Sequence, residues 1–155
     1  MKLKLDNSKT YEPFTNDEIS KIFFAIKTEV GWKMWVSLIA MYAGARRSEI
    51  VQLRAQDIKY DSDSERYYIL ITELAGSVKT ENATRQIPIH EVLISMGFLN
   101  FVNECDERLF PSLKPDAVTK WFTKLREKLG INRVDDYGNK KVFHSFRHSF
   151  ITSSR

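Results

Sequence analysis

The alternation of hydrophobic and polar positions predicts helices in the first third of the chain. Thr15 to Glu18 form a capping box, and apolar residues follow at the spacing of one helical face, so we expect a helix from about Asn16. Trp32 to Tyr42 are apolar on most sides, which predicts a buried central helix. After a tight turn at residues 43–45, residues 46–53 predict a third, short helix.

The pattern changes to that of strands after residue 57. Residues 58–60 and 67–72 flank a polar turn, as in a hairpin, and residues 84–89 alternate in the same way after a second turn at 76–80. We therefore expect an α+β fold: a mainly helical domain with a small antiparallel sheet of about three strands. Lys79 is expected at or near a hairpin tip, where a lysine is commonly just solvated.

Helical patterns return in the second half of the chain. Residues 91–104 predict one helix, and Pro115 begins another that Gly130 ends. The second helix carries Lys120, Lys124 and Lys128 in a stripe opposite its apolar face. Such a stripe can lie along a nucleic-acid backbone, or it can serve solubility alone.

The stretch from His144 to His148 carries the most distinctive chemistry. As a helix it places His144, Arg147 and His148 on one face and turns Phe143, Phe146 and Phe150 toward a core. Imidazoles transfer protons near neutral pH, and a guanidinium matches the oxygens of a phosphate. The group therefore suits an anionic oxygen of a phosphodiester, although a short turn with these residues can also be a solvated edge.

Metal binding is the other interpretation of two histidines four residues apart. In a zinc helix of the H-E-x-x-H type a glutamate follows the first histidine, whereas Ser145 stands there in this chain. Arg147 between the imidazoles opposes a cation, and Cys105 is the single cysteine. We therefore predict no metal site.

Length and composition are those of an ordinary globular domain. The chain of 155 residues, 43% hydrophobic and 28% charged, is long enough for one domain with a real core. No apolar run reaches membrane-spanning length, and the first residues lack the pattern of a signal peptide. A single cysteine favours a reducing, cytoplasmic setting.

The basic residues are concentrated near the C-terminal end. Residues 114–147 contain nine basic and four acidic residues, a net charge of +5, whereas residues 1–113 carry −2. The net charge of the whole chain is only +4. A basic region beside a nearly neutral remainder is typical of nucleic-acid binding, although solvated lysines give the same count.

Three motifs in this order resemble one known family. Residues 44–50 (GARRSEI), Lys79-Thr80 followed by residues 85–89 (RQIPI), and residues 144–148 (HSFRH) resemble the catalytic domain of tyrosine recombinases, the phage-integrase family. The resemblance covers nearly the whole chain. It implies the mixed fold expected above and an enzyme that breaks and rejoins DNA through a covalent 3′-phosphotyrosine.

The resemblance also implies a role for each motif residue. Arg46 and Arg147 are expected to hold the reacting phosphate and stabilise its transition state, and Lys79 to protonate the departing 5′ oxygen. His144 is expected to assist proton movement, with Glu49 and His148 in support. Duplex DNA and a homo-oligomer, a tetramer on DNA, are the implied partners, and no metal or other cofactor is needed.

One part of the family pattern does not match. The nucleophilic tyrosine of these enzymes follows the histidine helix, whereas all six tyrosines of this chain precede His144. We therefore expect residues 1–155 to be a single domain, most of a catalytic domain, without the nucleophile segment and without the N-terminal core-binding domain. A non-catalytic DNA-binding module and an enzyme like the type IB topoisomerases remain the alternatives.

Overall fold

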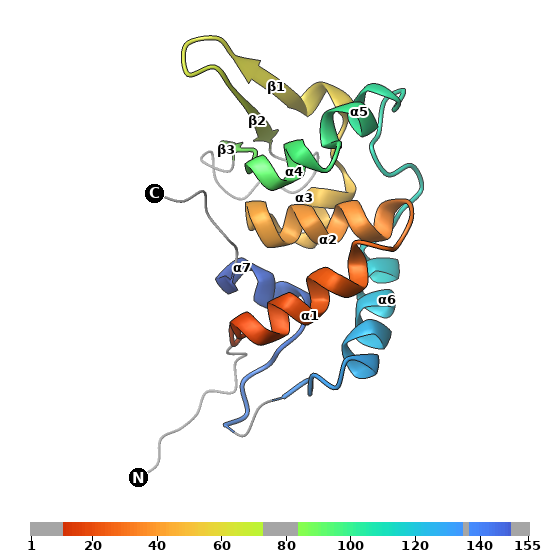
Figure 1. Cartoon of the computed structure of the whole chain (residues 1–155). Helices are drawn as coiled ribbons and strands as arrows, with labels where there is room; N and C mark the ends of the chain where they lie inside the picture. The colour runs from red at the N-terminus through yellow and green to blue at the C-terminus, as the bar shows by residue number, and fades with distance from the viewer. Residues whose placement is uncertain (1–10, 73–83, 135–136, 150–155) are drawn as a thin grey trace.

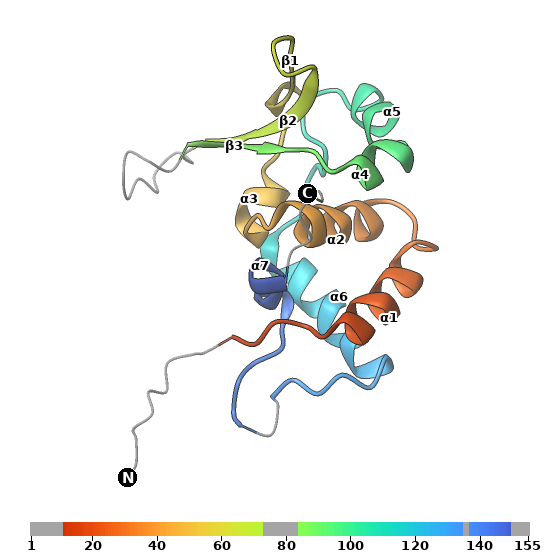
Figure 2. The same ribbon diagram turned by 60° about the vertical axis from the view of Figure 1, so that its left-hand side comes forward.

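The computed structural model describes residues 11–72, 84–134 and 137–149. The chain is arranged in layers, with a small sheet and short helices above a central helix, and further helices below it (Figures 1 and 2). The predicted α+β fold is confirmed. None of the described helices is long and apolar enough to cross a membrane.

The first three helices follow the predicted pattern closely. Helix α1 (Asn16–Ile26) begins at the capping box, in which the Thr15 hydroxyl accepts from the Glu18 amide and the Glu18 carboxylate accepts from the Thr15 amide. Helix α2 (Trp32–Ala43) is the buried centre, with eight buried residues, and ends at Gly44 in the left-handed conformation. Helix α3 (Arg47–Val51) is shorter than the predicted helix, which was expected to include Leu53.

The sheet has the predicted hairpin and a third strand. Strands β1 (Ile58–Asp61), β2 (Arg66–Ile71) and β3 (Arg85–Pro88) pair antiparallel in the order β1-β2-β3, after a short 3₁₀ turn η1 (Ala55–Asp57). Ile69 is fully buried and pairs with both Ile58 and Ile87. Lys79 belongs to the connection between β2 and β3 and lies outside the described residues.

The prediction of one continuous helix over residues 91–104 is wrong. The structure has two short helices, α4 (Glu91–Ser95) and α5 (Phe98–Asn103). The chain turns between them at Gly97, whose φ of 95° lies in the left-handed region that a side chain rarely adopts. The turn buries Phe98 completely against Trp35, with ring centroids 5.3 Å apart.

The C-terminal elements differ from prediction in one respect. Helix α6 (Pro115–Lys128) has the predicted start and apolar face, and Gly130 follows it with a positive φ of 77°. The histidine stretch is not one helix: Phe143–Ser145 form a 3₁₀ turn, η2, and Phe146–Ser149 form one turn of α-helix, α7. Phe143 and Phe146 are buried as expected, and Phe150 lies outside the described residues.

The segment before α1 packs on the segment that leads into α7. The Glu12 amide donates to the Lys140 carbonyl at 2.8 Å, and the Phe14 amide donates to the Ser149 hydroxyl at 2.7 Å. The Phe14 ring is buried between Phe122 and Phe146. The histidine motif is therefore held in place by residues about 130 positions earlier in the chain.

Candidate functional site

Arg46 is positioned by a carboxylate that it shares with the sheet. Its backbone amide donates to Oε1 of Glu49 at 2.8 Å, and its Nη1 lies 3.3 Å from Oε2. Arg85, the first residue of β3, binds both oxygens of the same carboxylate with its two terminal nitrogens, each at 3.0 Å. Glu49 thus joins helix α3 to strand β3.

The Glu49 side chain is ionised in this arrangement. Burial by itself raises the pKa of Glu49, but hydrogen bonds from Arg85 and from the Arg46 backbone outweigh burial and leave the pKa below its usual value. The Glu49 side chain is 13% exposed, whereas that of Arg46 is 52% exposed. The carboxylate is therefore largely enclosed, and the guanidinium of Arg46 remains open to an external anion.

Arg147, in helix α7, contacts the end of the central helix α2. Its Nη1 donates to the carbonyl of Gly44 at 2.9 Å. Burial lowers the pKa of Arg147, the nearby charges of Arg46 and Arg85 lower it further, and the charge of Glu49 raises it. Three arginines therefore lie near one carboxylate, and the excess positive charge favours a further anion beside them.

His144 is neutral in this environment. Burial lowers the pKa of His144 below its usual 6.5, and the charges of Arg147, His148, Arg46 and Arg47 add to the effect. Tyr11 covers one side of the imidazole, with ring centroids 4.5 Å apart. A neutral imidazole can accept a proton at pH 7, as proton transfer at a phosphate requires.

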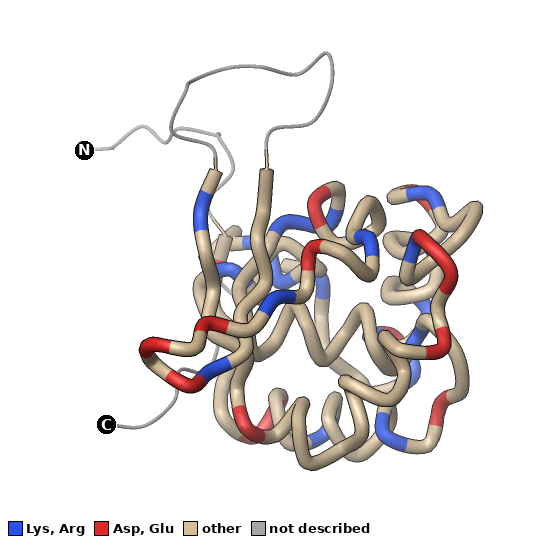
Figure 3. Tube along the Cα trace, turned by 90° about the horizontal axis from the view of Figure 1, so that it is seen from above, with Lys and Arg blue, Asp and Glu red and all other residues tan. Residues whose placement is uncertain are grey.

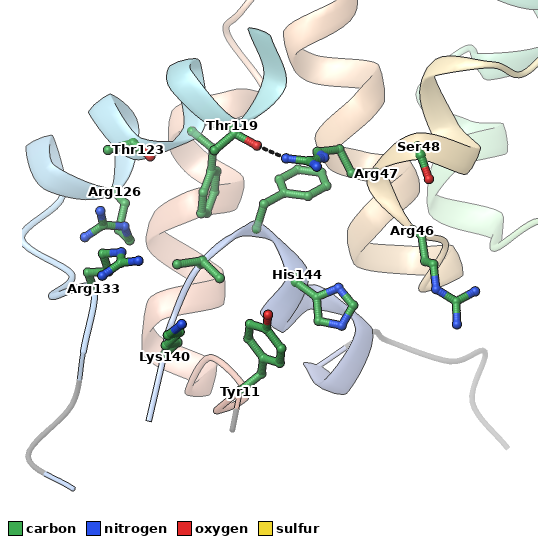
Figure 4. Close-up of a pocket in the computed structure, with 13 residues that line it drawn as sticks. Tyr11, Arg46, Arg47, Ser48, Thr119, Thr123, Arg126, Arg133, Lys140 and His144 are labelled. Carbon is green, nitrogen blue, oxygen red and sulfur yellow. Dashed lines mark hydrogen bonds between the residues drawn. The ribbon is translucent and has the colours of Figure 1, made fainter. Parts of the chain in front are cut away.

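Arg46 and His144 share one pocket of about 420 Å³ (Figure 4). Its walls come from α3, α6, η2 and the segments before α1 and η2. At its centre Nη1 of Arg47 donates a hydrogen bond to the Thr119 hydroxyl of α6. The lining is strongly basic and includes Arg46, Arg47, Arg126, Arg133, Lys140 and His144.

The basic pocket lies away from the turn of the β1–β2 hairpin. Figure 1 places α6 and α7 below the central helix and the hairpin above it. Figure 3 shows acidic residues at the turn of that hairpin. The basic lining of the pocket and this acidic turn therefore lie on different parts of the molecule.

A comparison with protein-family models decides the classification. The model described as "Phage integrase family" matches residues 12–153. The chain belongs to the phage integrase family. No individual curated protein sequence matches it.

Solved structures of integrase-family proteins have the same fold. XerH site-specific recombinase bound to difH, in a pre-cleavage complex, is 21% identical with a TM-score of 0.65, and the match covers 94% of this chain and 43% of that one. XerA recombinase is 18% identical with a TM-score of 0.66, covering 95% and 50%. Lambda integrase (residues 75–356) bound to DNA is 20% identical with a TM-score of 0.64, covering 94% and 51%. This integrase-family chain thus spans about half the length of these proteins or less.

The predicted catalytic residues of the integrase motifs are only partly assembled in the described structure. Arg46 and His144 line the pocket, and Arg147 lies close enough to both for their charges to interact. Glu49 supports Arg46 directly. His148 is exposed beside Tyr11 and His144, with ring centroids 6.3 and 5.9 Å away. The position of Lys79 relative to the pocket stays a prediction.

The predicted lysine stripe lies on another face of α6. Lys120, Lys124 and Lys128 are exposed and do not line the pocket. With 3.6 residues per turn, the centre of the stripe is roughly 150° around the helix from the pocket-lining residues of α6. The described ranges, searched for groups of three or more His, Cys, Asp and Glu side chains, contain none that could hold a metal ion.

Several residues of the site were not predicted from the sequence. Arg85 was part of a motif, but nothing in the sequence linked it to Glu49, 36 positions earlier. Tyr11 gave no signal, because its partner His144 is 133 residues away. Arg126 did give a signal in the sequence. It lies four residues after Phe122, next to the apolar face of α6, where a charged residue is unusual. In the structure Arg126 is 4% exposed.

Proposed function

We propose that this chain is most of the catalytic domain of a site-specific DNA recombinase or integrase, which binds a phosphodiester of duplex DNA at Arg46, Arg147 and His144. The observation that carries the proposal is the close approach of Arg46, Arg147 and a neutral His144. Burial and then the charges of the neighbouring cations, Arg147 first and Arg46 among them, lower the pKa of His144, and no acidic residue is among the causes of this shift. Such a group is stabilised by an anion, and a phosphate supplies the oxygens that guanidinium groups bind best.

The proposed reaction exchanges one phosphodiester for another. A tyrosine oxygen attacks the phosphorus, the bond from phosphorus to the 5′ oxygen breaks, and the 5′ oxygen takes a proton. Arg46 and Arg147 neutralise the charge on the non-bridging oxygens in the transition state. Lys79 supplies the proton by the resemblance, and His144 receives the proton of the tyrosine. The DNA ends in a 3′-phosphotyrosine, so the bond energy is retained and no metal or other cofactor is required.

The nucleophile is proposed to come from a segment after the histidine motif, as in the family pattern. The structure offers one rival, because Tyr11 lines the same pocket as Arg46 and His144. In-line attack needs an oxygen held opposite the leaving group. The Tyr11 ring packs against the imidazole, so we assign Tyr11 to covering His144 rather than to attack.

The assembly is proposed to be a homotetramer on duplex DNA. A solved lambda integrase tetramer bound to a Holliday junction is 19% identical to this chain, with a TM-score of 0.62. Exchange of strands between two duplexes requires four cleavages, one for each strand. One active site in each of four subunits supplies them.

A nicked suicide substrate tests the reaction. The 155-residue chain and a version extended through a family-type nucleophile segment are incubated with nicked duplex DNA and separated on a denaturing gel. A slow-migrating, protease-sensitive DNA band is expected only with the extended protein. Because the arginines stabilise transition-state charge, Arg46→Ala or Arg147→Ala should reduce the band at least about 100-fold.

Tyr11→Phe in both proteins is the matched control. It keeps the ring over His144 and removes only the hydroxyl, so the band from the extended protein should persist. A covalent band from the 155-residue chain that disappears with Tyr11→Phe would identify Tyr11 as the nucleophile and overturn our assignment. No band from the extended protein at all would contradict the enzyme proposal and favour a non-catalytic DNA-binding module.

A further inference from the structure

The pocket has a second basic end that the proposed reaction does not use. Arg126 and Arg133 lie beside one another at the opposite end from Arg46, with Lys140 close by (Figure 4). They come from different segments: Arg126 from α6, Arg133 from the loop after it, and Lys140 from the segment leading into η2. The fold therefore collects three cations from separate parts of the chain in one place.

Arg126 is an unusual arginine because it is buried without full hydrogen bonding. The residue is only 4% exposed. Its Nη1 donates to the Ile131 carbonyl at 2.9 Å, but its Nε has no hydrogen-bond partner among the described residues. A buried charge with an unmade hydrogen bond is costly, so the Arg126 guanidinium calls for a further partner such as a water molecule or an ion.

The charges around Arg126 do not provide that compensation. Burial lowers the pKa of Arg126; Glu127, the next residue along α6, raises it, and Arg133 lowers it. None of the described residues that line the pocket is Asp or Glu. The described acids near the basic end are engaged elsewhere: Glu12 accepts from Asn139, and Glu18 is paired with Lys141.

We propose that Arg126, Arg133 and Lys140 form a second phosphate-binding subsite, which takes a backbone phosphate of the DNA strand whose reacting phosphate lies at Arg46 and His144. The cavity of about 420 Å³ is within the range of ligand pockets and has room for more than one phosphate group. The assignment of the phosphate to DNA rests on the proposed function. The subsite itself rests on Arg126 and its neighbours.

Inorganic phosphate tests the subsite without DNA. In a ¹⁵N-labelled protein the side-chain Nε–H signal of Arg126, identified by its loss in Arg126→Lys, is followed during titration with phosphate. A saturable shift is expected, and chloride at equal ionic strength should not reproduce it. The double variant R133Q/K140Q should weaken phosphate binding at least about tenfold while the folded spectrum is retained. No saturable shift, or an unchanged one in the double variant, overturns the subsite.

Salt dependence of DNA binding tests the source of the phosphate. Fluorescence anisotropy with duplex DNA gives the slope of log K against log salt, which changes by about 0.9 for each phosphate that the protein no longer neutralises. R133Q/K140Q should flatten the slope by about 0.9 or more. The matched control K21Q/K59Q removes the same charge from exposed positions outside the pocket and should change the slope less.

The two measurements separate the subsite from the proposed function. One outcome is equal slopes of log K against log salt for R133Q/K140Q and K21Q/K59Q while the wild-type protein binds phosphate at Arg126. That result would assign the subsite to free phosphate and overturn its assignment to DNA. A protein that binds phosphate at Arg126 but never forms the covalent band when extended would contradict the proposed reaction and support the subsite. If phosphate causes no saturable shift at Arg126 but the extended protein still forms the covalent band, the subsite is overturned and the proposed reaction at Arg46 and Arg147 stands.

Discussion

At the residue scale, Glu49 controls the geometry of the site without contacting the reacting atoms in the proposed reaction. Its carboxylate receives the amide and Nη1 of Arg46 and both terminal nitrogens of Arg85. The family motif predicted Glu49 as a supporting residue, and in the structure its carboxylate contacts Arg46. It could not indicate Arg85, because hydrogen bonds between a helix start and a distant strand leave no periodic pattern.

Glu49→Gln should destabilise the protein. Gln can still accept the Arg46 amide, but it removes the charge that holds Arg85. We expect unfolding free energy to fall by roughly 1–2 kcal/mol at pH 7, measured by urea denaturation, since charged hydrogen bonds contribute about 1.5–3 kcal/mol and these arginines are partly exposed. Glu104→Gln, at an exposed position, should have little effect.

The effect of Glu49→Gln should depend on pH in a defined direction. The pKa of Glu49 is lowered below its ordinary 4.5 by folding, so its stabilisation is complete above pH 4.5. As pH falls through the lower folded value, the carboxylate takes up a proton and the stabilisation is lost. The difference between the wild type and the variant should therefore shrink below about pH 4.5; a constant difference would contradict the charged interaction.

His144 should titrate below its ordinary pKa of 6.5, because burial and nearby cations disfavour the imidazolium. NMR titration of the imidazole measures this directly. Burial is the largest cause, so Tyr11→Ala, which uncovers the ring, should raise the pKa of His144 more than Arg47→Gln, which removes the weakest of its causes. Bound phosphate should also raise it. A value at or above 6.5 in the free protein would contradict the neutral imidazole.

At the element scale, features that neighbouring residues determine were predicted well. Features that depend on contacts between distant residues were predicted poorly. The start of α1 and the end of α6 were predictable because capping residues and glycine act on their own neighbours. The break at Gly97 was not predicted, because burial of Phe98 against Trp35 decides it. The same holds for η2 and α7, where the Phe14 amide donates to the Ser149 hydroxyl and Nη1 of Arg147 donates to the Gly44 carbonyl.

Helix α6 carries the exposed lysine stripe on one face and the buried Arg126 on another, and salt dependence distinguishes their roles. If the exposed stripe lies along DNA, replacing Lys120, Lys124 and Lys128 by Ala should flatten the slope of log K against log salt by about 0.9 for each phosphate that these lysines neutralise. An unchanged slope would assign the stripe to solubility. It would then be the pocket face of α6, with Arg126, that lies toward the DNA.

At the scale of the whole molecule, the start of the described chain holds the histidine motif in place. Phe14 packs on Phe146 at 4.9 Å between ring centroids, and Lys141 pairs with Glu18 at 3.0 Å. The family motifs gave no indication of what holds the histidine motif in place. The capping box at Thr15 predicts the start of a helix, and only the folded chain shows that residues 11–18 contact the segment that carries this motif.

Phe14→Ala should show how much this packing contributes. The ring is 5% exposed, so we expect unfolding free energy to fall by about 3–5 kcal/mol in urea denaturation, with weaker DNA binding as α7 loosens. Phe24→Ala removes a ring that is 64% exposed and should lower it by less than about 1 kcal/mol. Equal effects of the two substitutions would contradict a structural role for the segment before α1.

The carboxylate of Glu49 also has a mechanical consequence. Arg85 begins β3, and the connection that carries Lys79 ends at that strand. Tilting the sheet relative to α3 would break the two charged hydrogen bonds between Arg85 and Glu49, so this contact resists such a movement. A displacement of β3 would therefore act on Arg46 through Glu49, which does not contact the reacting atoms in the proposed reaction.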